Sequence, residues 1–125
     1  MTGIRGGRIL DPATGTEKTA DLLIQDGKIA AMGQGLDFSG CEEIIEAEGL
    51  TVAPGLVDVH VHFRDPGLTY KEDIHTGAAA AAAGGFTTVV CMANTRPVTD
   101  NPETLRYVLE QGKDTGIHVL ACASV

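Results

Sequence analysis

The sequence predicts an α/β protein in two parts, a small antiparallel β-sheet domain over residues 1–53 and a strand–helix domain with a parallel sheet over residues 54–125. Three observations predict this fold. Asp26-Gly27 joins two short apolar runs, which is a strong hairpin signal. In the second half, helical stretches alternate with β-branched apolar runs, the pattern of a parallel sheet. Those runs carry polar residues mainly at their C-terminal ends, as buried parallel strands do.

The first half contains short apolar runs separated by turn residues. We expect strands at residues 7–10, 20–25, 28–32, 43–47 and 50–53. Asp11-Pro12 ends the first of them, and Glu48-Gly49 separates the last two. Nothing in this half resembles a reactive group of side chains, so the search for function moves to the second half.

The second half alternates strands and helices. We expect strands at residues 56–62, 87–92 and 117–123, and helices at residues 70–83 and 102–111. Thr69 is the expected N-cap of the first helix, with Glu72 as its capping-box partner, and Gly84-Gly85 ends it. Asn101 is the expected N-cap of the second helix, with Pro102 in the tolerated first position.

Composition excludes several classes of function. The formal net charge of −8 and the lack of a basic run argue against a nucleic-acid partner. The soft apolar stretch at residues 77–85 is too short to span a membrane, and the N-terminus does not resemble a signal peptide. Three widely spaced cysteines without a C-x-x-C pair argue against a disulfide framework and a thiolate zinc site. We therefore expect a cytoplasmic protein, in which Cys91 and Cys122 act as small buried apolar residues.

His60 and His62 are the candidate metal ligands. Residues two apart on a strand point to the same side, so both imidazoles can reach one cation. A bare H-x-H pair also arises by chance. Here the pair closes an apolar strand directly before a loop, and that edge of a parallel α/β sheet is where ligands bind.

Three further polar residues lie near the pair in the sequence. Asp58 shares its face, and two roles are open to it: orienting a histidine as a carboxylate partner, or capping a neighbouring element. Arg64 follows the pair, and its guanidinium suits a substrate carboxylate, although a loop arginine is usually a solvated surface residue. Asn94 holds the analogous position after the second strand, where its amide could bind substrate or simply shape a turn.

The second half resembles the signature of the dihydroorotases, a branch of the cyclic amidohydrolases in the amidohydrolase superfamily. The matching segments are GLVDVHVHFRDPG at 55–67, KEDI at 71–74, GGFTT at 84–88 and MANTRP at 92–97. The family more often has proline where Ala93 stands. Residues 1–53 also look like the small β domain that precedes the barrel in these enzymes.

The resemblance implies the start of a (β/α)₈ barrel, of which three strands and two helices lie in this chain. It implies that His60 and His62 bind one or two zinc ions, and that Arg64 and Asn94 contact a substrate carboxylate. The implied reaction is the reversible hydrolysis of dihydroorotate to N-carbamoyl-L-aspartate in pyrimidine biosynthesis, with metal-activated water. The proton-transferring Asp and the other metal ligands would lie beyond Val125. We therefore expect an N-terminal portion that is inactive alone.

Two alternatives to dihydroorotase stay open. One is a related enzyme of the dihydropyrimidinase or allantoinase type, whose uncharged ring needs no carboxylate clamp such as Arg64. The other is a non-catalytic, dihydroorotase-like partner of another enzyme, against which the intact His60 and His62 weigh. The resemblance further implies a small-molecule substrate, a homo-oligomer and association with aspartate transcarbamoylase.

Overall fold

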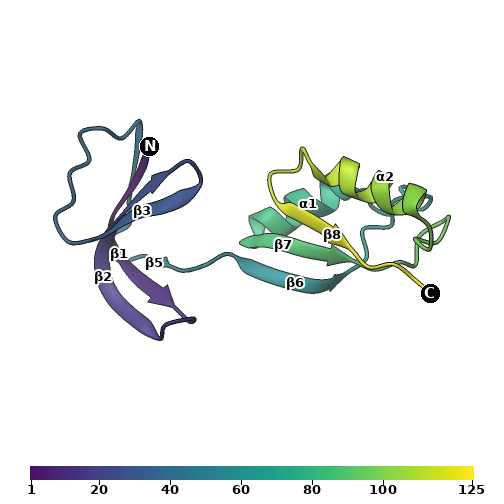
Figure 1. The fold of residues 1–125 in the computed structure, drawn as a ribbon, viewed down its shortest axis with the longest axis horizontal. Coiled ribbons are helices and arrows are strands. Elements are labelled where there is room, and N and C mark those ends of the chain that lie inside the picture. The colour runs from purple at the N-terminus through teal and green to yellow at the C-terminus, as the bar shows by residue number, and fades with distance from the viewer. The chain divides into compact units, whose positions relative to one another are not determined.

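The computed structural model describes all 125 residues, which form two compact units, Met1–Pro54 and Gly55–Val125 (Figure 1). The N-terminal unit is a five-stranded sheet, and the C-terminal unit is a three-stranded sheet with two helices. The predicted α/β class is therefore confirmed. Neither helix is long and apolar enough to cross a membrane.

The N-terminal unit is built around its first strand. Its strands are β1 (Thr2–Asp11), β2 (Thr16–Gln25), β3 (Lys28–Gly33), β4 (Glu43–Glu46) and β5 (Thr51–Val52). The predicted Asp-Gly hairpin is confirmed, because β2 and β3 pair antiparallel with Gln25 opposite Lys28. Asp26 and Gly27 both have positive φ, 51° and 70°, as a tight hairpin turn whose twist matches its strands requires.

The prediction of an antiparallel sheet in this unit was wrong in part, because the sheet is mixed. β2 pairs antiparallel with β1, but β4 and β5 pair parallel with it. The hairpin β2–β3 and residues 34–42 act as a crossover, which parallel pairing requires. Both β4 and β5 therefore run in the same direction as β1 and pair with its edge opposite β2. Alternation of apolar residues gives the faces of a strand but not its direction.

The C-terminal unit is a parallel sheet with the strand order β6-β7-β8. Its elements are β6 (Leu56–Val61), α1 (Ile74–Ala83), β7 (Phe86–Cys91), α2 (Pro102–Gly112) and β8 (His118–Ala121). The predicted alternation of parallel strands and helices is confirmed. All three strands therefore end at the same edge of the sheet.

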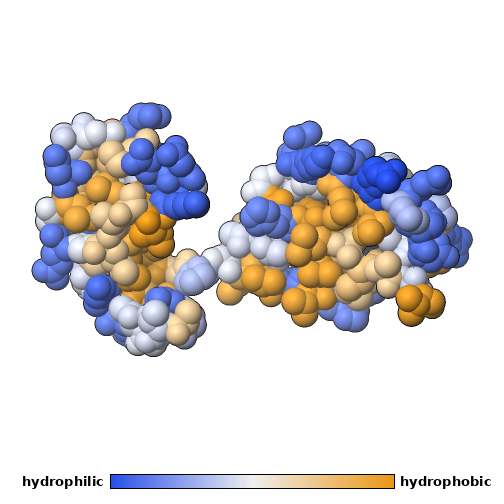
Figure 2. Space-filling model, viewed as in Figure 1, coloured by the Kyte–Doolittle hydropathy of each residue, from blue (hydrophilic) through white to orange (hydrophobic).

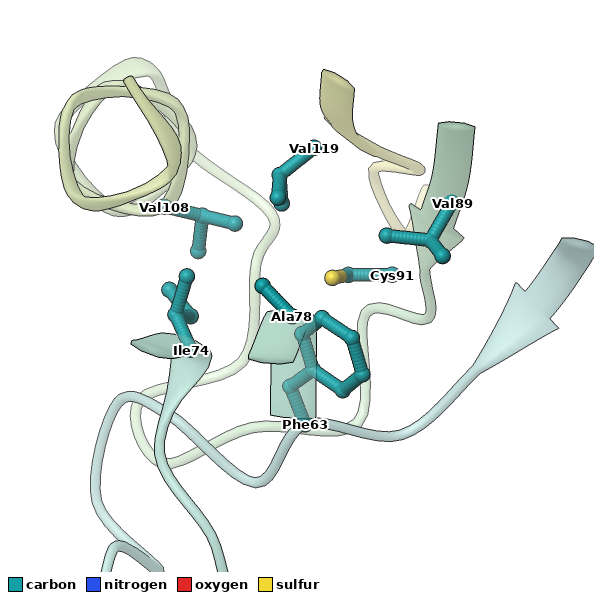
Figure 3. Close-up of a cluster of buried hydrophobic side chains, with 7 residues drawn as sticks. All are labelled: Phe63, Ile74, Ala78, Val89, Cys91, Val108 and Val119. Carbon is teal, nitrogen blue, oxygen red and sulfur yellow. The ribbon is translucent and has the colours of Figure 1, made fainter. Parts of the chain in front are cut away.

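The core of this unit lies between the helices and the strands (Figure 3). Seven side chains form it: Phe63, Ile74, Ala78, Val89, Cys91, Val108 and Val119. Burial raises the pKa of the Cys91 thiol to about 11, with a smaller contribution from Cys122. Cys91 is thus a small buried apolar residue, as predicted. Cys122 is exposed, so the same prediction was wrong there.

Helix α1 begins later than predicted. Its N-cap is Asp73 and not Thr69, because the Asp73 carboxylate accepts a 2.8 Å hydrogen bond from the Thr76 backbone N–H, and Thr76 completes a capping box. These hydrogen bonds hold the pKa of Asp73 below its ordinary value. The predicted end at Gly84 and the predicted N-cap of α2, Asn101, are both confirmed.

Part of the strand surface in the C-terminal unit is open. Val57 and Val59 of β6 are 58% and 68% exposed, although buried parallel strands were expected. β6 is an edge strand of this sheet and pairs only with β7. Figure 2 shows hydrophobic residues gathered over the strands of this unit.

Candidate functional site

The candidate site lies at the C-terminal edge of the parallel sheet. His60 is the second-to-last residue of β6, and His62 is the first residue after that strand. Asn94 lies three residues after the end of β7. Backbone hydrogen bonds continue the strand pairing just beyond the strand ends. The Met92 N–H donates to the Val61 carbonyl and the Cys122 N–H donates to the Cys91 carbonyl, both at 2.9 Å. The sheet therefore brings the three chain segments that follow its strands to one place.

The structure brings His60, His62 and Asn94 together. They line an open pocket of about 510 Å³ with four more residues: Met92, Ala93, Val98 and Ser124. The two imidazole rings lie edge to face, with centroids 5.2 Å apart. The His62 Nδ1 and the Asn94 Oδ1 are 2.8 Å apart, a hydrogen bond in which the ring nitrogen donates. Both histidines are exposed at this edge.

Asp58 does not line this pocket. Its Oδ1 accepts a 3.0 Å hydrogen bond from the backbone N–H of His60. The pairing of β6 with β7 is irregular between Asp58 and Val61, so the carboxylate supplies a partner to a backbone group beside the irregularity. In this structure Asp58 contacts the backbone of His60 and not its ring.

Arg64 is also outside the pocket lining, two residues after His62. Its backbone has a φ of 62°, in the left-handed region that few residues other than glycine adopt. Its carbonyl accepts a 2.8 Å hydrogen bond from the Leu68 N–H, which closes a turn. The backbone that carries Arg64 is therefore held in a specific conformation.

The loop after β7 is fixed by buried hydroxyl groups. Thr95 Oγ1 lies 2.9 Å from Thr99 Oγ1 and donates to the Pro97 carbonyl at 2.7 Å. Thr99 is 1% exposed, and its carbonyl accepts from the Ser124 N–H at 2.8 Å. These contacts place Ser124 beside the pocket. Ser124 was not predicted from the sequence, although its position just after the third strand is the signal that would have identified it.

Gly67 allows the two loops to meet. It has a φ of 92°, and a Cβ there would collide with the backbone carbonyl of Arg96. Close by, the Arg96 N–H donates to the Pro66 carbonyl at 3.0 Å. Only a residue without a side chain fits between these backbones.

We predict that Gly67→Ala lowers the free energy of unfolding by about 3 kcal/mol, from about 1 kcal/mol of backbone strain and the rest from overpacking. Gly85→Ala is the matched control, because Gly85 has a similar φ of 83° but open space around it. Gly85→Ala should lower the free energy of unfolding only by the backbone strain, about 1 kcal/mol. Urea unfolding of both variants measures the difference, and equal losses would contradict the close approach at Gly67.

A second pocket, of about 530 Å³, lies in the N-terminal unit beside Asp21. The Asp21 carboxylate accepts backbone hydrogen bonds from Gly6, Gly35 and Leu36, which hold its pKa below the ordinary value. The carboxylate thus joins the turn at Gly6 to the loop at residues 35–36, and its role is to organise this loop.

Comparison with known proteins places the chain in a family. The model of the dihydro-orotase-like family matches residues 49–125. The dihydroorotase of Clostridioides difficile (strain 630) is 53% identical over all 125 residues, which are 30% of that protein. The dihydroorotase of Streptococcus pneumoniae serotype 4 is 54% identical over the same length, which is 29% of that protein. The chain thus spans less than a third of these curated relatives.

Solved structures share the fold. The L-hydantoinase (dihydropyrimidinase) from Arthrobacter aurescens is similar with a TM-score of 0.82 and 26% identity, over 98% of this chain and 27% of that one. The matched family model covers more than half of the chain, including the strand that carries His60 and the loop that carries Asn94. The chain therefore belongs to the dihydro-orotase-like family.

Proposed function

We propose that this chain forms the N-terminal portion of a dihydroorotase, which interconverts dihydroorotate and N-carbamoyl-L-aspartate in pyrimidine biosynthesis. The observation that carries the proposal is the grouping of His60, His62 and Asn94 at the C-terminal edge of a parallel sheet. The relatives named dihydroorotase, at 53% and 54% identity over the whole chain, support it.

The donor set fits part of a zinc site. Because the His62 Nδ1 is hydrogen-bonded to Asn94, its Nε2 is the nitrogen left for a cation, and such a bond to the other ring nitrogen is common for metal-binding histidines. Catalytic zinc sites have three protein ligands, whereas no group of three or more possible ligand residues occurs in this chain. We propose that His60 and His62 bind one or two zinc ions together with ligands from outside these 125 residues.

When bound, zinc would polarise the ring carbonyl of the substrate and lower the pKa of water. The residues of this chain would bind and orient. We propose that the Arg64 guanidinium holds the substrate carboxylate through two parallel hydrogen bonds. Asn94 can serve two groups at once, because its Oδ1 accepts from His62 while its Nδ2 is left to donate to that carboxylate. Asp58 would fix the strand beneath His60, and an Asp from outside this chain would transfer the proton.

The two units would have different roles in the whole enzyme. We propose that residues 54–125 begin a (β/α)₈ barrel, in which active sites lie at the C-terminal ends of the strands. Residues 1–53 would form part of a composite β domain. Formation of a homo-oligomer and association with aspartate transcarbamoylase are further predictions from the same resemblance.

The proposal predicts metal-dependent turnover of dihydroorotate by the intact enzyme that contains this segment. Ultraviolet absorbance follows the loss of dihydroorotate. We expect a chelator to remove most of the activity and added zinc to restore it, because bound metal contributes several kcal/mol to the transition state. Turnover that is indifferent to chelation would contradict the zinc proposal, and no turnover of dihydroorotate by the metal-loaded enzyme would contradict the proposed substrate.

A second candidate function is hydrolysis of a neutral cyclic amide. The structural similarity to a hydantoinase with a TM-score of 0.82 favours it. The same assay with a hydantoin in place of dihydroorotate separates the two functions. We expect the higher kcat/KM for dihydroorotate.

A further inference from the structure

Asp65 is a buried carboxylate at the start of the loop between β6 and α1. It is 6% exposed and follows Arg64 directly. Its Oδ1 accepts a 2.9 Å hydrogen bond from the Tyr107 hydroxyl, and its Oδ2 accepts a longer one, 3.4 Å, from the Ile74 backbone N–H. Burial of a carboxylate is costly unless such partners are present. The two contacts therefore fix where this side chain, and the backbone that carries it, can lie.

The hydrogen bond to Tyr107 connects the loop after β6 to helix α2, 42 residues further along the chain. The Tyr107 side chain is 41% exposed, and its hydroxyl end is partly buried. This partial burial raises the pKa of the hydroxyl, and the hydrogen bond to Asp65 and the charge of that carboxylate raise it further. The hydroxyl therefore keeps its proton throughout the neutral range and can donate to Asp65. A bond to a charged acceptor is stronger than one between neutral groups.

Arg64 lies between two fixed neighbours. Phe63, before it, is in the core of the C-terminal unit at 6% exposure (Figure 3). Asp65, after it, accepts the hydrogen bond from Tyr107. The positive φ of Arg64 is strained for a residue with a side chain, and such a conformation persists only where its surroundings determine it. The contacts of Asp65 are part of those surroundings.

We propose that Tyr107 is a positioning residue: through Asp65 it holds the backbone of Arg64 in the conformation that aims the guanidinium at the substrate carboxylate. This inference rests on the proposed function. Without the Tyr107 hydroxyl, the loop spends part of its time in other conformations. The apparent affinity for dihydroorotate then falls in proportion to the fraction of molecules whose loop is in the binding-competent conformation. The enzyme–substrate complex, once formed, reacts as before.

The test is Tyr107→Phe in the intact enzyme. We expect the KM for dihydroorotate to rise about 5- to 20-fold, because a hydrogen bond to a buried charge is worth about 1–2 kcal/mol. The kcat should stay within about twofold of the wild type, since the competent loop is the one that reacts. Tyr70→Phe is the matched control, because Tyr70 lies in the loop that carries Arg64 and Asp65, is 79% exposed and has no hydrogen bond from its hydroxyl. It should leave both constants unchanged.

The double variant Arg64→Met/Tyr107→Phe separates positioning from a general structural effect. If Tyr107 acts through Arg64, its removal should change KM little once the guanidinium is gone. Fully additive effects, or an equal loss of kcat and kcat/KM in Tyr107→Phe, would overturn the inference. An unchanged KM in Tyr107→Phe would also overturn it.

Hydrogen exchange adds a measurement that does not depend on activity. In Tyr107→Phe, but not in Tyr70→Phe, the amides of Leu68 and Ile74 should exchange faster, because both are bonded to this loop. Unchanged exchange at both amides would overturn the positioning role. A wild-type enzyme without turnover of dihydroorotate contradicts the proposed function, whereas an active wild type with an unaffected Tyr107→Phe contradicts the positioning role alone.

Discussion

His60→Ala and His62→Ala should each reduce the turnover of dihydroorotate by the intact enzyme by about 10³-fold or more. The two imidazoles lie 5.2 Å apart, centroid to centroid, at the sheet edge, and each would supply one nitrogen to the metal. A catalytic zinc ion has few protein ligands, so loss of one removes much of its binding energy. A metal contribution of several kcal/mol to the transition state corresponds to a rate effect of this size. Assays at saturating dihydroorotate, together with the zinc content of each purified variant, measure it.

Two other histidines provide matched controls. His75 is on α1, where its Nε2 lies 3.3 Å from the Gln111 side chain, and His118 begins β8 at the opposite end of the strand from the site. His75→Ala and His118→Ala should retain zinc and turnover within about twofold, as surface substitutions away from special features usually do. Zinc loss in these variants, with His60→Ala and His62→Ala unaffected, would contradict the proposed ligands.

The sequence predicted the site-bearing unit well because its signals are local. Each parallel strand is a short, mainly apolar run, and each helix is bounded by caps and glycines within a few residues. In a parallel sheet the C-terminal ends of the strands lie at one edge, so residues that follow neighbouring strands are predicted to lie close together. The hydrogen bond between His62 and Asn94 agrees with this prediction.

The predictions of strand direction in the N-terminal unit and of the α1 N-cap were wrong because strand pairing and helix capping depend on distant or competing partners. The parallel direction of β4 and β5 depends on how the chain crosses over, and no local pattern encodes it. At α1, both Thr69 and Asp73 can serve as N-caps by residue type. Asp73 is the cap, because a separate turn precedes it in which the Lys71 N–H donates to the Leu68 carbonyl.

The bond between Tyr107 and Asp65 shows a second limit. A tyrosine on a helix has no sequence signal that points to a carboxylate 42 residues earlier. Such a pair becomes visible only once packing has placed α2 beside the loop. Residues that hold a site in place are therefore harder to predict than residues that form it, because they follow no strand-end or spacing rule.

Arg64→Met should raise the KM for dihydroorotate about 100-fold and leave the KM for a neutral hydantoin within about twofold. The guanidinium would hold the dihydroorotate carboxylate through two charge-assisted hydrogen bonds, together worth about 3 kcal/mol. Methionine keeps an unbranched side chain but offers neither charge nor donor. A neutral hydantoin has no carboxylate for the guanidinium to bind, so the same substitution removes no hydrogen bond from its complex with the enzyme.

Arg96→Met is the matched comparison for this prediction. Arg96 is an exposed arginine of the neighbouring loop. Its backbone packs closely against the loop that carries Arg64, but its guanidinium makes no hydrogen bond there. We expect its KM for dihydroorotate to stay within about threefold, because an exposed charge acts on an anion mainly through screened attraction. Steady-state kinetics with both substrates, in wild type and both variants, give the four ratios needed. Equal effects of Arg64→Met on the two substrates would show that Arg64 does not bind the carboxylate, and would favour an enzyme that acts on neutral rings.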